Sequence, residues 1–515
     1  MTKLLTAAQM RAIEQAAIAS GGLTGLDLME RAGRGVVDAV FAQWPELAAG
    51  SFRAVVLCGP GNNGGDGFVV ARVLKRWGWD VDAFLYGDAA KLPPDARANY
   101  VRWREMGAVA QLGKKTLEDA AFPGQCALVV DALFGTGLVR PVDLPLGALE
   151  CMPKVGQTHR IVAVDLPSGI CSDSGRVIGS QTNVVNADLT VTFHRAKLGH
   201  YLAQGASASG KVTAVDIGLE DIGSAPERTV SCVDGPSAGL AKASDSHKFS
   251  HGHALVLSGS QCNTGAARLA AQGALRVGAG LVTVGAPSDA LADCAAHLTA
   301  VMLTGVQDGQ ALDHVLQDGR INGLCLGPGL GLDRAADMVQ VALGGVDPRP
   351  TVLDADALTA IAVEPALFEM LHDKCILTPH AGEFARLFPD IAKKLNAPAS
   401  IGPAYSKVDA TREAARRTGC VVLFKGPDTV IAAPDGLCSI NRAINDRAAP
   451  WLATAGSGDV LAGFITGLLA RGFTPMQAAQ TGAWLHVECA LSFGAGLIAE
   501  DIADEIHNVF KSLGL

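Results

Sequence analysis

The sequence predicts an α/β protein with two three-layer domains, each a largely parallel sheet covered by helices on both faces. Short apolar runs alternate with helix-length segments along the chain, and most runs are bounded by Gly, Pro or Asp, as in buried parallel strands. The chain has 515 residues, about three times the common domain size. One stretch, residues 216–248, interrupts the alternation and divides the chain in two.

The first 220 residues are expected to begin with two helices. Thr6 is placed to cap the first helix, and Gln9, three residues later, completes a capping box. The second helix is expected over 25–44, because Pro45 ends it. Strands are then predicted at 54–58, 81–85, 127–130, 161–164 and 189–193.

Residues 216–248 are rich in Gly, Ser, Pro and acidic residues, which is typical of a domain boundary. We therefore predict one domain over 1–222 and a second over 235–515. In the second domain, strands are predicted at 254–257, 281–284, 323–326, 351–353, 375–377, 421–424 and 430–433.

Composition excludes several classes of function. The net charge of −9 argues against a surface for nucleic acid or an anionic membrane, although backbone N–H groups can still bind phosphate. The 12 cysteines form no C-x-x-C pair, which suggests thiols in a reducing cytosol. Neither a signal peptide nor a run of 18 apolar residues is present. We expect a cytoplasmic homo-oligomer that acts on small molecules.

The sharpest motif of the first domain follows the strand at 54–58. Residues 59–67, GPGNNGGDG, are predicted to form a loop that presents N–H groups to an anion at the start of a helix. The loop satisfies G-x-G-x-x-G, with Asp80 and Asp82 about twenty residues later, so an NAD-dependent dehydrogenase is a rival interpretation. Asp66 counts against that rival, because a carboxylate in the loop would repel pyrophosphate. Coincidence in a chain with 60 glycines is the third interpretation.

Two further motifs follow predicted strands, VDALFGTGL at 130–138 and VDLPSG at 164–169. Ligands of open α/β sheets bind at this end of the strands. Asn63, Asp131 and Ser168 offer oxygen atoms to a hard cation. Asp165 is a candidate acid or base, although an Asp at a strand end is also common as a turn cap.

With the loop at 59–67, these motifs resemble the NAD(P)H-hydrate epimerase family over about residues 5–220. The resemblance implies that the domain interconverts the R and S hydrates of NADH and NADPH, that Asp165 is catalytic, and that the cation at Asn63, Asp131 and Ser168 is K⁺. It also implies a set of residues that bind the hydrate: Asn62, Asn63, Gly64, Gly65, Asp66, Gly135, Thr136, Gly137, Leu138, Val139, Arg140, Pro141 and Asp165.

The second domain contains TAGSGDVL at 454–461, just before an apolar helical pattern. Backbone N–H groups there can hold phosphate oxygens, and Asp459 can accept a hydroxyl proton during phosphoryl transfer. An Asp in a first helical turn is equally what a plain N-cap looks like. Asp354 and Asp356 form a D-x-D pair, which we interpret as mainly structural, with contact to Mg²⁺ left open.

Seven ordered motifs from about residue 247 to the C-terminus resemble the ribokinase-like superfamily, specifically ADP-dependent NAD(P)H-hydrate dehydratase. They are TGAA at 264–267, RVGAGLVT at 276–283, LGPGLG at 326–331, LDADAL at 353–358, LTPHAGEF at 377–384, KGPDT at 425–429 and GSGD at 456–459. The resemblance implies a ribokinase-like fold and Mg²⁺. It implies hydrate binding by Ala266, Gly329, His380 and Asp459, with Asp459 catalytic. It implies binding of ADP and AMP by Lys425, Gly426, Pro427, Asp428, Thr429 and Gly458.

Together the two resemblances imply a bifunctional enzyme that repairs hydrated nicotinamide nucleotides, with a Rossmann-like first domain. His380 taken alone is more typical of a hydrogen-bonded structural histidine. ADP as the donor comes from the resemblance alone. The rival is an NAD-dependent dehydrogenase fused to a small-molecule kinase, and a nucleotide-sensing or scaffolding protein is a non-enzymatic alternative. No Walker A motif occurs, so a P-loop kinase is not expected.

Overall fold

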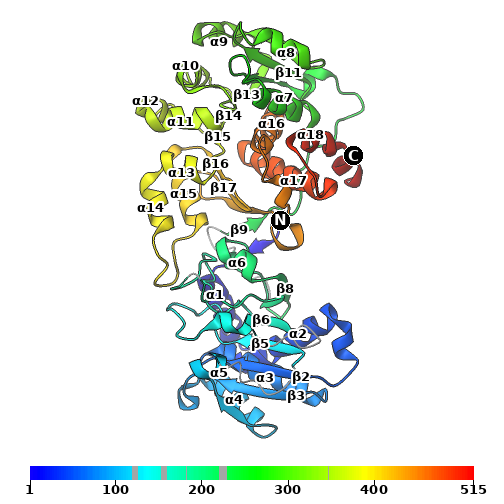
Figure 1. Cartoon of the computed structure of the whole chain (residues 1–515), viewed down its shortest axis with the longest axis vertical. Helices are drawn as coiled ribbons and strands as arrows, with labels where there is room; N and C mark the ends of the chain where they lie inside the picture. Colours follow the sequence, from blue (N-terminus) through cyan, green and yellow to red (C-terminus); the bar gives the residue numbers. More distant parts are fainter. Residues whose placement is uncertain (119–125, 152–158, 181, 220–228, 346) are drawn as a thin grey trace. The chain divides into compact units, whose positions relative to one another are not determined.

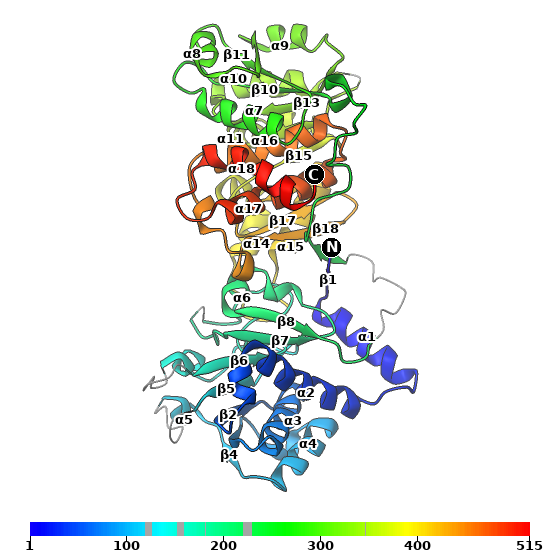
Figure 2. The same ribbon diagram turned by 90° about the vertical axis from the view of Figure 1, so that its right-hand side faces the viewer.

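The computed structural model describes residues 1–118, 126–151, 159–180, 182–219, 229–345 and 347–515. The chain divides into two compact units. Unit 1 consists of Met1–Thr2, Val230–Asn396 and Val408–Leu515, and unit 2 consists of Lys3–Thr229 and Ala397–Lys407. Each unit is built on its own sheet (Figures 1 and 2). The predicted domain ranges, 1–222 and 235–515, stay a prediction from the sequence.

The sheet of unit 2 has the strand order β4-β3-β2-β5-β6-β7-β8, and its neighbouring strands pair in parallel. Its strands are β2 (Arg53–Cys58), β3 (Asp80–Leu85), β4 (Val109–Gln111), β5 (Leu128–Ala132), β6 (Arg160–Val164), β7 (Leu189–Phe193) and β8 (Lys211–Val215). The chain order turns back between β2 and β5, where open α/β sheets bind ligands.

The two faces of this sheet are buried in separate cores. Val56 of β2 packs with the helices α2 to α4, whereas Val55 and Leu57 face a second core that includes Ala399 and Ala404 of the segment 397–407. Burial on both faces explains why these strands read as continuous apolar runs. The helices of unit 2 are α1 (Ala7–Ala19), α2 (Gly25–Gln43), α3 (Asn62–Arg76), α4 (Pro94–Arg104), α5 (Lys114–Glu118) and α6 (Ala203–Ala208).

The capping box predicted at Thr6 and Gln9 is confirmed at the start of α1. The prediction of a loop over 59–67 is wrong in its second half, because α3 begins at Asn62 and the residues NNGGDG form its first turns. Two consecutive glycines allow this start, because a Cβ atom on Gly64 would collide with Gly59 and one on Gly65 would collide with Met29. Asp66 is therefore a helical residue.

The sheet of unit 1 runs in the order β9-β18-β17-β16-β15-β14-β13-β10-β11-β12. Its strands are β9 (Val230–Cys232), β10 (His253–Leu257), β11 (Leu281–Ala286), β12 (Met302–Gly305), β13 (Ile321–Leu326), β14 (Thr351–Leu353), β15 (Cys375–Leu377), β16 (Val421–Phe424), β17 (Asp428–Ala432) and β18 (Cys438–Arg442). Pairing is parallel except that β17 is antiparallel to both β16 and β18. Strand β9 lies inside the stretch 216–248, where no strand was predicted.

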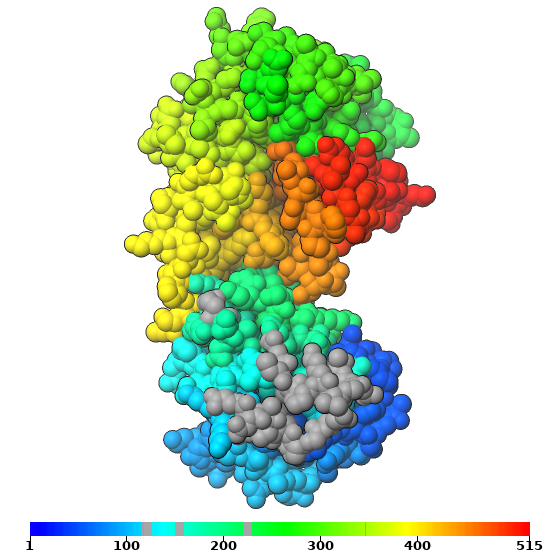
Figure 3. Space-filling view, in the orientation of Figure 1, coloured from blue at the N-terminus to red at the C-terminus, as the bar shows by residue number. Residues whose placement is uncertain are grey.

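Helices cover both faces of this sheet. In Figure 1, α10 to α15 lie on one side of the strands, and α7, α16, α17 and α18 lie on the other; the space-filling view of Figure 3 shows the same separation of yellow from orange and red segments. The bounds are α7 (Gly265–Arg276), α8 (Leu291–His297), α9 (Gly309–Val315), α10 (Leu332–Leu343), α11 (Ala355–Val363), α12 (Pro365–Phe368), α13 (Ala381–Leu387), α14 (Pro389–Asn396), α15 (Lys407–Thr418), α16 (Ser457–Ala470), α17 (Pro475–Phe493) and α18 (Ala499–Ser512).

Small residues let α16 pack closely on α7. A Cβ atom on Gly463 would lie 2.1 Å from the carbonyl oxygen of Ala270, and one on Gly467 would lie 2.5 Å from that of Ala274. This contact fixes the start of α16 beside the start of α7. The predicted α/β class with two sheet-based domains is confirmed. Within the described part of the chain, no helix is long and apolar enough to cross a membrane.

Candidate active sites

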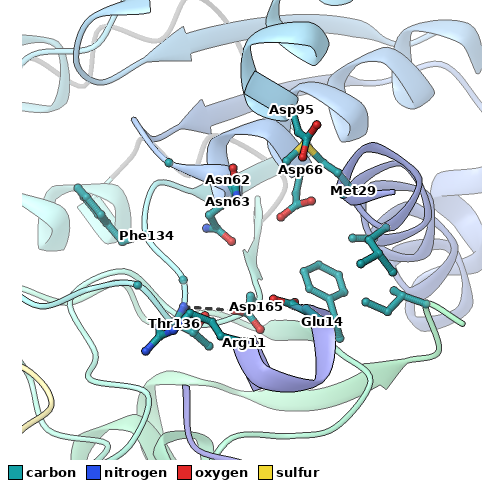
Figure 4. Close-up of a pocket in the computed structure, with 18 of the residues that line it drawn as sticks. Arg11, Glu14, Met29, Asn62, Asn63, Asp66, Asp95, Phe134, Thr136 and Asp165 are labelled. Carbon is teal, nitrogen blue, oxygen red and sulfur yellow. Dashed lines mark hydrogen bonds between the residues drawn. The ribbon is translucent and has the colours of Figure 1, made fainter. Parts of the chain in front are cut away.

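Unit 2 contains a cavity of about 510 Å³ at the carboxyl ends of β2, β5 and β6. Figure 4 shows that its walls come from α1, the start of α3, the turn after β5, and Asp165 directly after β6. Its charged lining residues are Arg11, Glu14, Asp66, Asp95 and Asp165.

Close backbone contacts set the shape of this cavity. A Cβ atom on Gly59 would lie 1.7 Å from the carbonyl oxygen of Leu133, so only glycine lets the loop after β2 approach the turn after β5. A Cβ atom on Gly135 would lie 2.8 Å from Asn63 Oδ1 and 2.9 Å from Asp165 Oδ2. Glycine at position 135 therefore leaves room for both polar side chains in the site.

Asp165 is held from several directions. Its backbone has φ of 65°, in the left-handed region that Asp tolerates better than most residues. Oδ1 accepts hydrogen bonds from Thr192 Oγ1 and Lys197 Nζ, each at 2.9 Å, and Oδ2 accepts one from the backbone N–H of Thr136 at 3.2 Å. Oδ2 therefore faces the cavity, and Oδ1 is bound to the protein.

Lys197 makes Asp165 an ionised group. Burial alone would raise the pKa of this carboxyl, but the charge and hydrogen bond of Lys197 outweigh burial and hold the pKa below its usual range. The ammonium is 1% exposed and also donates to Thr192 Oγ1 at 2.7 Å and to the carbonyl oxygen of Phe193 at 3.1 Å. The carboxylate is thus ready to accept a proton.

His200 fixes the backbone of Asp165. Its Nδ1 accepts the N–H of Lys197 at 2.9 Å, so Nε2 carries the proton and donates to the carbonyl oxygen of Asp165 at 2.8 Å. Burial, with the nearby charge of Lys197, lowers the pKa of His200 to about 4. This histidine is neutral and positions the turn.

Asp131, Ser168 and Asn63 surround the turn after β5. Ser168 donates to Asp131 from Oγ at 2.6 Å and from N–H at 2.8 Å, and Ser168 Oγ accepts the N–H of Phe134 at 3.0 Å. Burial raises the pKa of Asp131 to about 6 despite these hydrogen bonds. Asn63 Nδ2 is buried without a hydrogen-bond partner. The oxygen atoms of Asp131, Ser168 and Asn63 are of the kind that a hard monovalent cation takes as ligands, whereas Asn63 Nδ2 is a donor and would not contact the ion.

The structure brings most of the predicted hydrate-binding residues to the cavity. Those that line it are Asn62, Asn63, Asp66, Gly135, Thr136, Gly137, Leu138 and Asp165. Gly64 and Gly65 lie beneath it in α3. Val139, Arg140 and Pro141 follow the lining turn but are not part of the lining. Pro141 packs instead beside Gly179.

The predicted catalytic aspartate of unit 1, Asp459, lies at the start of α16. The N-cap Gly456 has φ of 86°, which a glycine adopts freely, and Asp459 stands in the first turn. Burial and the nearby Asp354 raise the pKa of Asp459 to about 6, against the lowering effect of Lys425. A carboxyl with this pKa changes protonation close to neutral pH, as a general base does.

Lys425 is the cation of this site. Its ammonium donates to Asp354 Oδ1 at 2.7 Å and lies 3.9 Å from Glu383 Oε2. A Cβ atom on Gly458 would lie 3.6 Å from the same ammonium. Burial lowers the pKa of Lys425, but Asp354 and the other carboxylates outweigh this and raise it. Lys425 thus places a permanent positive charge at the N-terminus of α16, where an anion would be stabilised.

The other predicted hydrate-binding residues of unit 1 form two groups. Ala266 and Gly329 are adjacent, because a Cβ atom on Gly329 would lie 3.3 Å from that of Ala266. His380 caps α13: its Nδ1 accepts the N–H of Gly382, and Nε2 lies 3.4 Å from Glu383 Oε1. His380 therefore has a structural role as the N-cap of α13. Its ring is half-exposed and can also contact a ligand.

The predicted ADP-binding segment connects β16 to β17. Gly426 and Pro427 form the turn, Thr429 Oγ1 donates to the carbonyl oxygen of Gly426 at 2.7 Å, and Asp428 is the first residue of β17. Both carboxylates of the D-x-D pair have protein partners: Asp354 is paired with Lys425, and Asp356 accepts the N–H of Gly331 at 2.8 Å. In the described part of the chain, no three His, Cys, Asp or Glu side chains are grouped to hold a metal ion. Mg²⁺ in this unit stays a prediction, because that ion is usually held by one or two carboxylates together with waters and substrate phosphates.

Sequence reasoning missed Lys197, Glu14 and Glu383. Lys197 lies four residues after the end of β7. A lysine just beyond a buried strand is the sequence signal that could have identified it. Glu14 stands in an apolar stretch of α1 and enters the site only through the packing of that helix. Glu383 lies within the segment LTPHAGEF but carries no role there that the sequence reveals.

Comparison with known proteins gives matches to both units. A family model described as NAD(P)H-hydrate dehydratase matches residues 254–508, and one described as YjeF-related protein N-terminus matches residues 25–199. A bifunctional NAD(P)H-hydrate repair enzyme of Moorella thermoacetica is 37% identical, over 99% of this chain and 97% of its own length. One of Salinibacter ruber is 35% identical, over 98% and 96%. An NAD(P)H-hydrate epimerase of Roseobacter litoralis is 46% identical, over 42% of this chain and 100% of its own.

Proposed function

Because the chain belongs to the family of bifunctional NAD(P)H-hydrate repair enzymes, we propose that each unit carries one of that family's two activities. Unit 2 interconverts the R and S hydrates of NADH and NADPH. Unit 1 converts the S hydrate back to NAD(P)H at the expense of ADP, which yields AMP and phosphate. The observation that carries this assignment is one carboxyl in each unit: Asp165 directly after β6, and Asp459 in the first turn of α16 near Asp354 and Lys425.

In unit 2, the hydrate binds in the cavity with C6 of its reduced ring near Asp165 Oδ2. The Asp165 carboxylate takes a proton from oxygen at C6, and Lys197 keeps this carboxylate ionised between turnovers. Asn63, Asp131 and Ser168 would hold K⁺ beside the turn after β5, where the ion would add positive charge to the wall of the cavity.

In unit 1, Asp459 accepts the proton of the C6 hydroxyl while the oxygen attacks the β-phosphorus of ADP, and AMP leaves. Lys425 and the N–H groups at the start of α16 stabilise the transferring phosphoryl group. The lone pair of N1 then expels phosphate from C6, and loss of a proton from C5 restores the dihydronicotinamide ring. Phosphoryl transfer here serves an elimination of water.

The test uses the full-length chain with purified R and S hydrates, with ADP or ATP, and with and without K⁺. Asp459→Asn is expected to abolish recovery of NADH absorbance and to leave epimer exchange intact, and Asp165→Asn should do the reverse. Separation of the two hydrates by chromatography follows exchange. Loss of both activities in either variant contradicts two independent sites.

A dehydrogenase with a fused kinase makes the opposite prediction. Its G-x-G-x-x-G loop would bind NAD⁺, and a substrate alcohol would be oxidised without any hydrate. The buried Asp66 at the start of α3 argues against pyrophosphate at that position. Oxidation of an alcohol by NAD⁺, with no hydrate recovery, would favour this rival.

A further inference from the structure

Asp66 is a buried carboxyl without a partner in the epimerase cavity. It stands in the first turns of α3, is 9% exposed, and lines the cavity beside Asn62 and Asn63. Among the described residues, its carboxyl has no hydrogen bond and no ion pair. An unpaired buried carboxyl is costly, so a site that keeps one normally uses it.

The charges around Asp66 are mainly negative. Asp165 and Glu14 face it across the cavity, Asp95 and Arg11 also line the cavity, and the thiol of Cys58 lies behind it. Burial, with the charges of Asp165 and Glu14, raises the pKa of Asp66 well above its usual value. These effects favour the neutral form of Asp66, whereas Lys197 favours the ionised form of Asp165, and two carboxyls whose pKa values are pushed apart are the usual acid and base of a site. Burial and the charge of Asp165 raise the pKa of Glu14 as well.

When epimerisation proceeds by breaking and re-forming the C6–O bond, proton transfer is needed on both sides of the ring. The hydroxyl of the R hydrate and that of the S hydrate lie on opposite faces of C6, so a single fixed carboxyl cannot reach both. Figure 4 shows Asp66 and Asp165 pointing into the cavity from opposite sides, with Glu14 nearer to Asp165. A ring held between Asp66 and Asp165 would present one face of C6 to each carboxyl.

We propose that Asp66 is a second catalytic acid–base residue of unit 2, which serves the face of the reduced nicotinamide ring opposite to Asp165. This proposal rests on the epimerase function proposed for unit 2. It assigns Asp66 a role in proton transfer, beyond contact with the substrate.

Asp66 gives its proton to the C6 hydroxyl on its side, the C6–O bond breaks with its electron pair on oxygen, and water leaves. The lone pair of N1 forms a double bond to C6. A solvent water adds to C6 on the other face, and its proton passes to the Asp165 carboxylate. The reverse reaction uses Asp165 as acid and Asp66 as base, and proton exchange with water resets both groups.

The route predicts that each epimerisation takes one oxygen atom from solvent. Full-length enzyme is incubated in H₂¹⁸O with purified R hydrate and K⁺ but without ADP, so that unit 1 does not consume the product. The two hydrates are separated by chromatography, and the ¹⁸O content of each is measured by mass spectrometry. An enzyme-free sample is the control for spontaneous exchange. We expect the S product to carry ¹⁸O at C6.

Variants assign the proton donor. Asp66→Asn should slow interconversion by about 100-fold or more, because a positioned acid contributes about that factor. It should still bind the hydrate, measured by equilibrium dialysis, and should unfold at no lower temperature, because it removes an unpaired buried acid. Glu14→Gln is the comparison variant, since Glu14 faces the same cavity but is only half-buried; it should slow interconversion by a smaller factor than Asp66→Asn does.

Three results would overturn the proposal: an S product without the label, an Asp66→Asn enzyme as fast as the wild type, or loss of exchange in Glu14→Gln alone. These results differ from failure of the epimerase assignment itself. In that case the wild-type enzyme would interconvert the hydrates no faster than the enzyme-free sample.

Discussion

Replacing Lys197 by methionine leaves the carboxylate of Asp165 buried without its partner. Lys197 is 1% exposed and donates to Asp165 Oδ1 at 2.9 Å. Methionine keeps most of the side-chain volume and removes the charge. Breaking a buried ion pair from one side costs about 3–5 kcal/mol. Since 1 kcal/mol lowers Tm by about 2–4 °C in a domain of this size, we expect the transition of unit 2 to fall by at least about 6 °C.

The pH dependence identifies the cause of this loss. In the wild type, the folded pKa of Asp165 lies below its unfolded value, so the group contributes stability above the unfolded pKa and loses it as pH falls through the folded pKa. In the variant, burial without Lys197 puts the folded pKa above the unfolded value, so Asp165 destabilises the fold at higher pH. The difference in Tm is therefore largest near about pH 8 and shrinks toward about pH 4.

Differential scanning calorimetry of the full-length chain between these pH values measures the effect. The double variant Lys197→Met with Asp165→Asn removes both charges, and we expect it to recover most of the lost stability. A loss in Lys197→Met that is the same at every pH would refute the reasoning. A double variant as unstable as the single one would also refute it, because lost packing would then be the cause.

Three further predictions concern the two sites. Dehydration should rise with pH through about 6, because Asp459 must be ionised to accept a proton, and a rate profile against pH checks this. Gly135→Ala places a methyl group 2.8 Å from Asn63 Oδ1, so epimer exchange should fall more than about tenfold while dehydration is unchanged in a coupled assay. Gly458→Ala meets only an ordinary contact at 3.6 Å, so Tm should stay constant while the Kd for ADP, from calorimetric titration, rises as the methyl group enters the phosphate site.

Strands buried on both faces could be predicted from the sequence, because both sides of such a strand are apolar. The run 189–193 matches β7 fully, and 351–353 matches β14. The edge strands β8 and β12 have mostly half-buried or exposed residues, so they form no apolar run and were missed. β18 was missed for another reason: it is buried but contains polar residues that pair with the antiparallel β17.

The candidate site followed a similar rule. Asp165 and Asp459 were predicted because each follows a glycine-rich or strand-end motif in the chain. The partners that set their pKa values, Lys197 and Asp354, come from other strands, and only folding brings them into contact. Local sequence thus indicated the candidate groups, and tertiary structure shifts their pKa values.

The division of the chain into units has a consequence for synthesis on the ribosome. Residues 397–407 belong to unit 2, and Ala399 and Ala404 are buried in its core, although Val230–Asn396 of unit 1 precedes them in the chain. Arg176 donates to the carbonyl oxygen of Ala397 as well. The nascent epimerase unit therefore cannot complete this core until most of the other unit has been translated. The site of unit 2 can therefore form completely only after most of unit 1 has been synthesised.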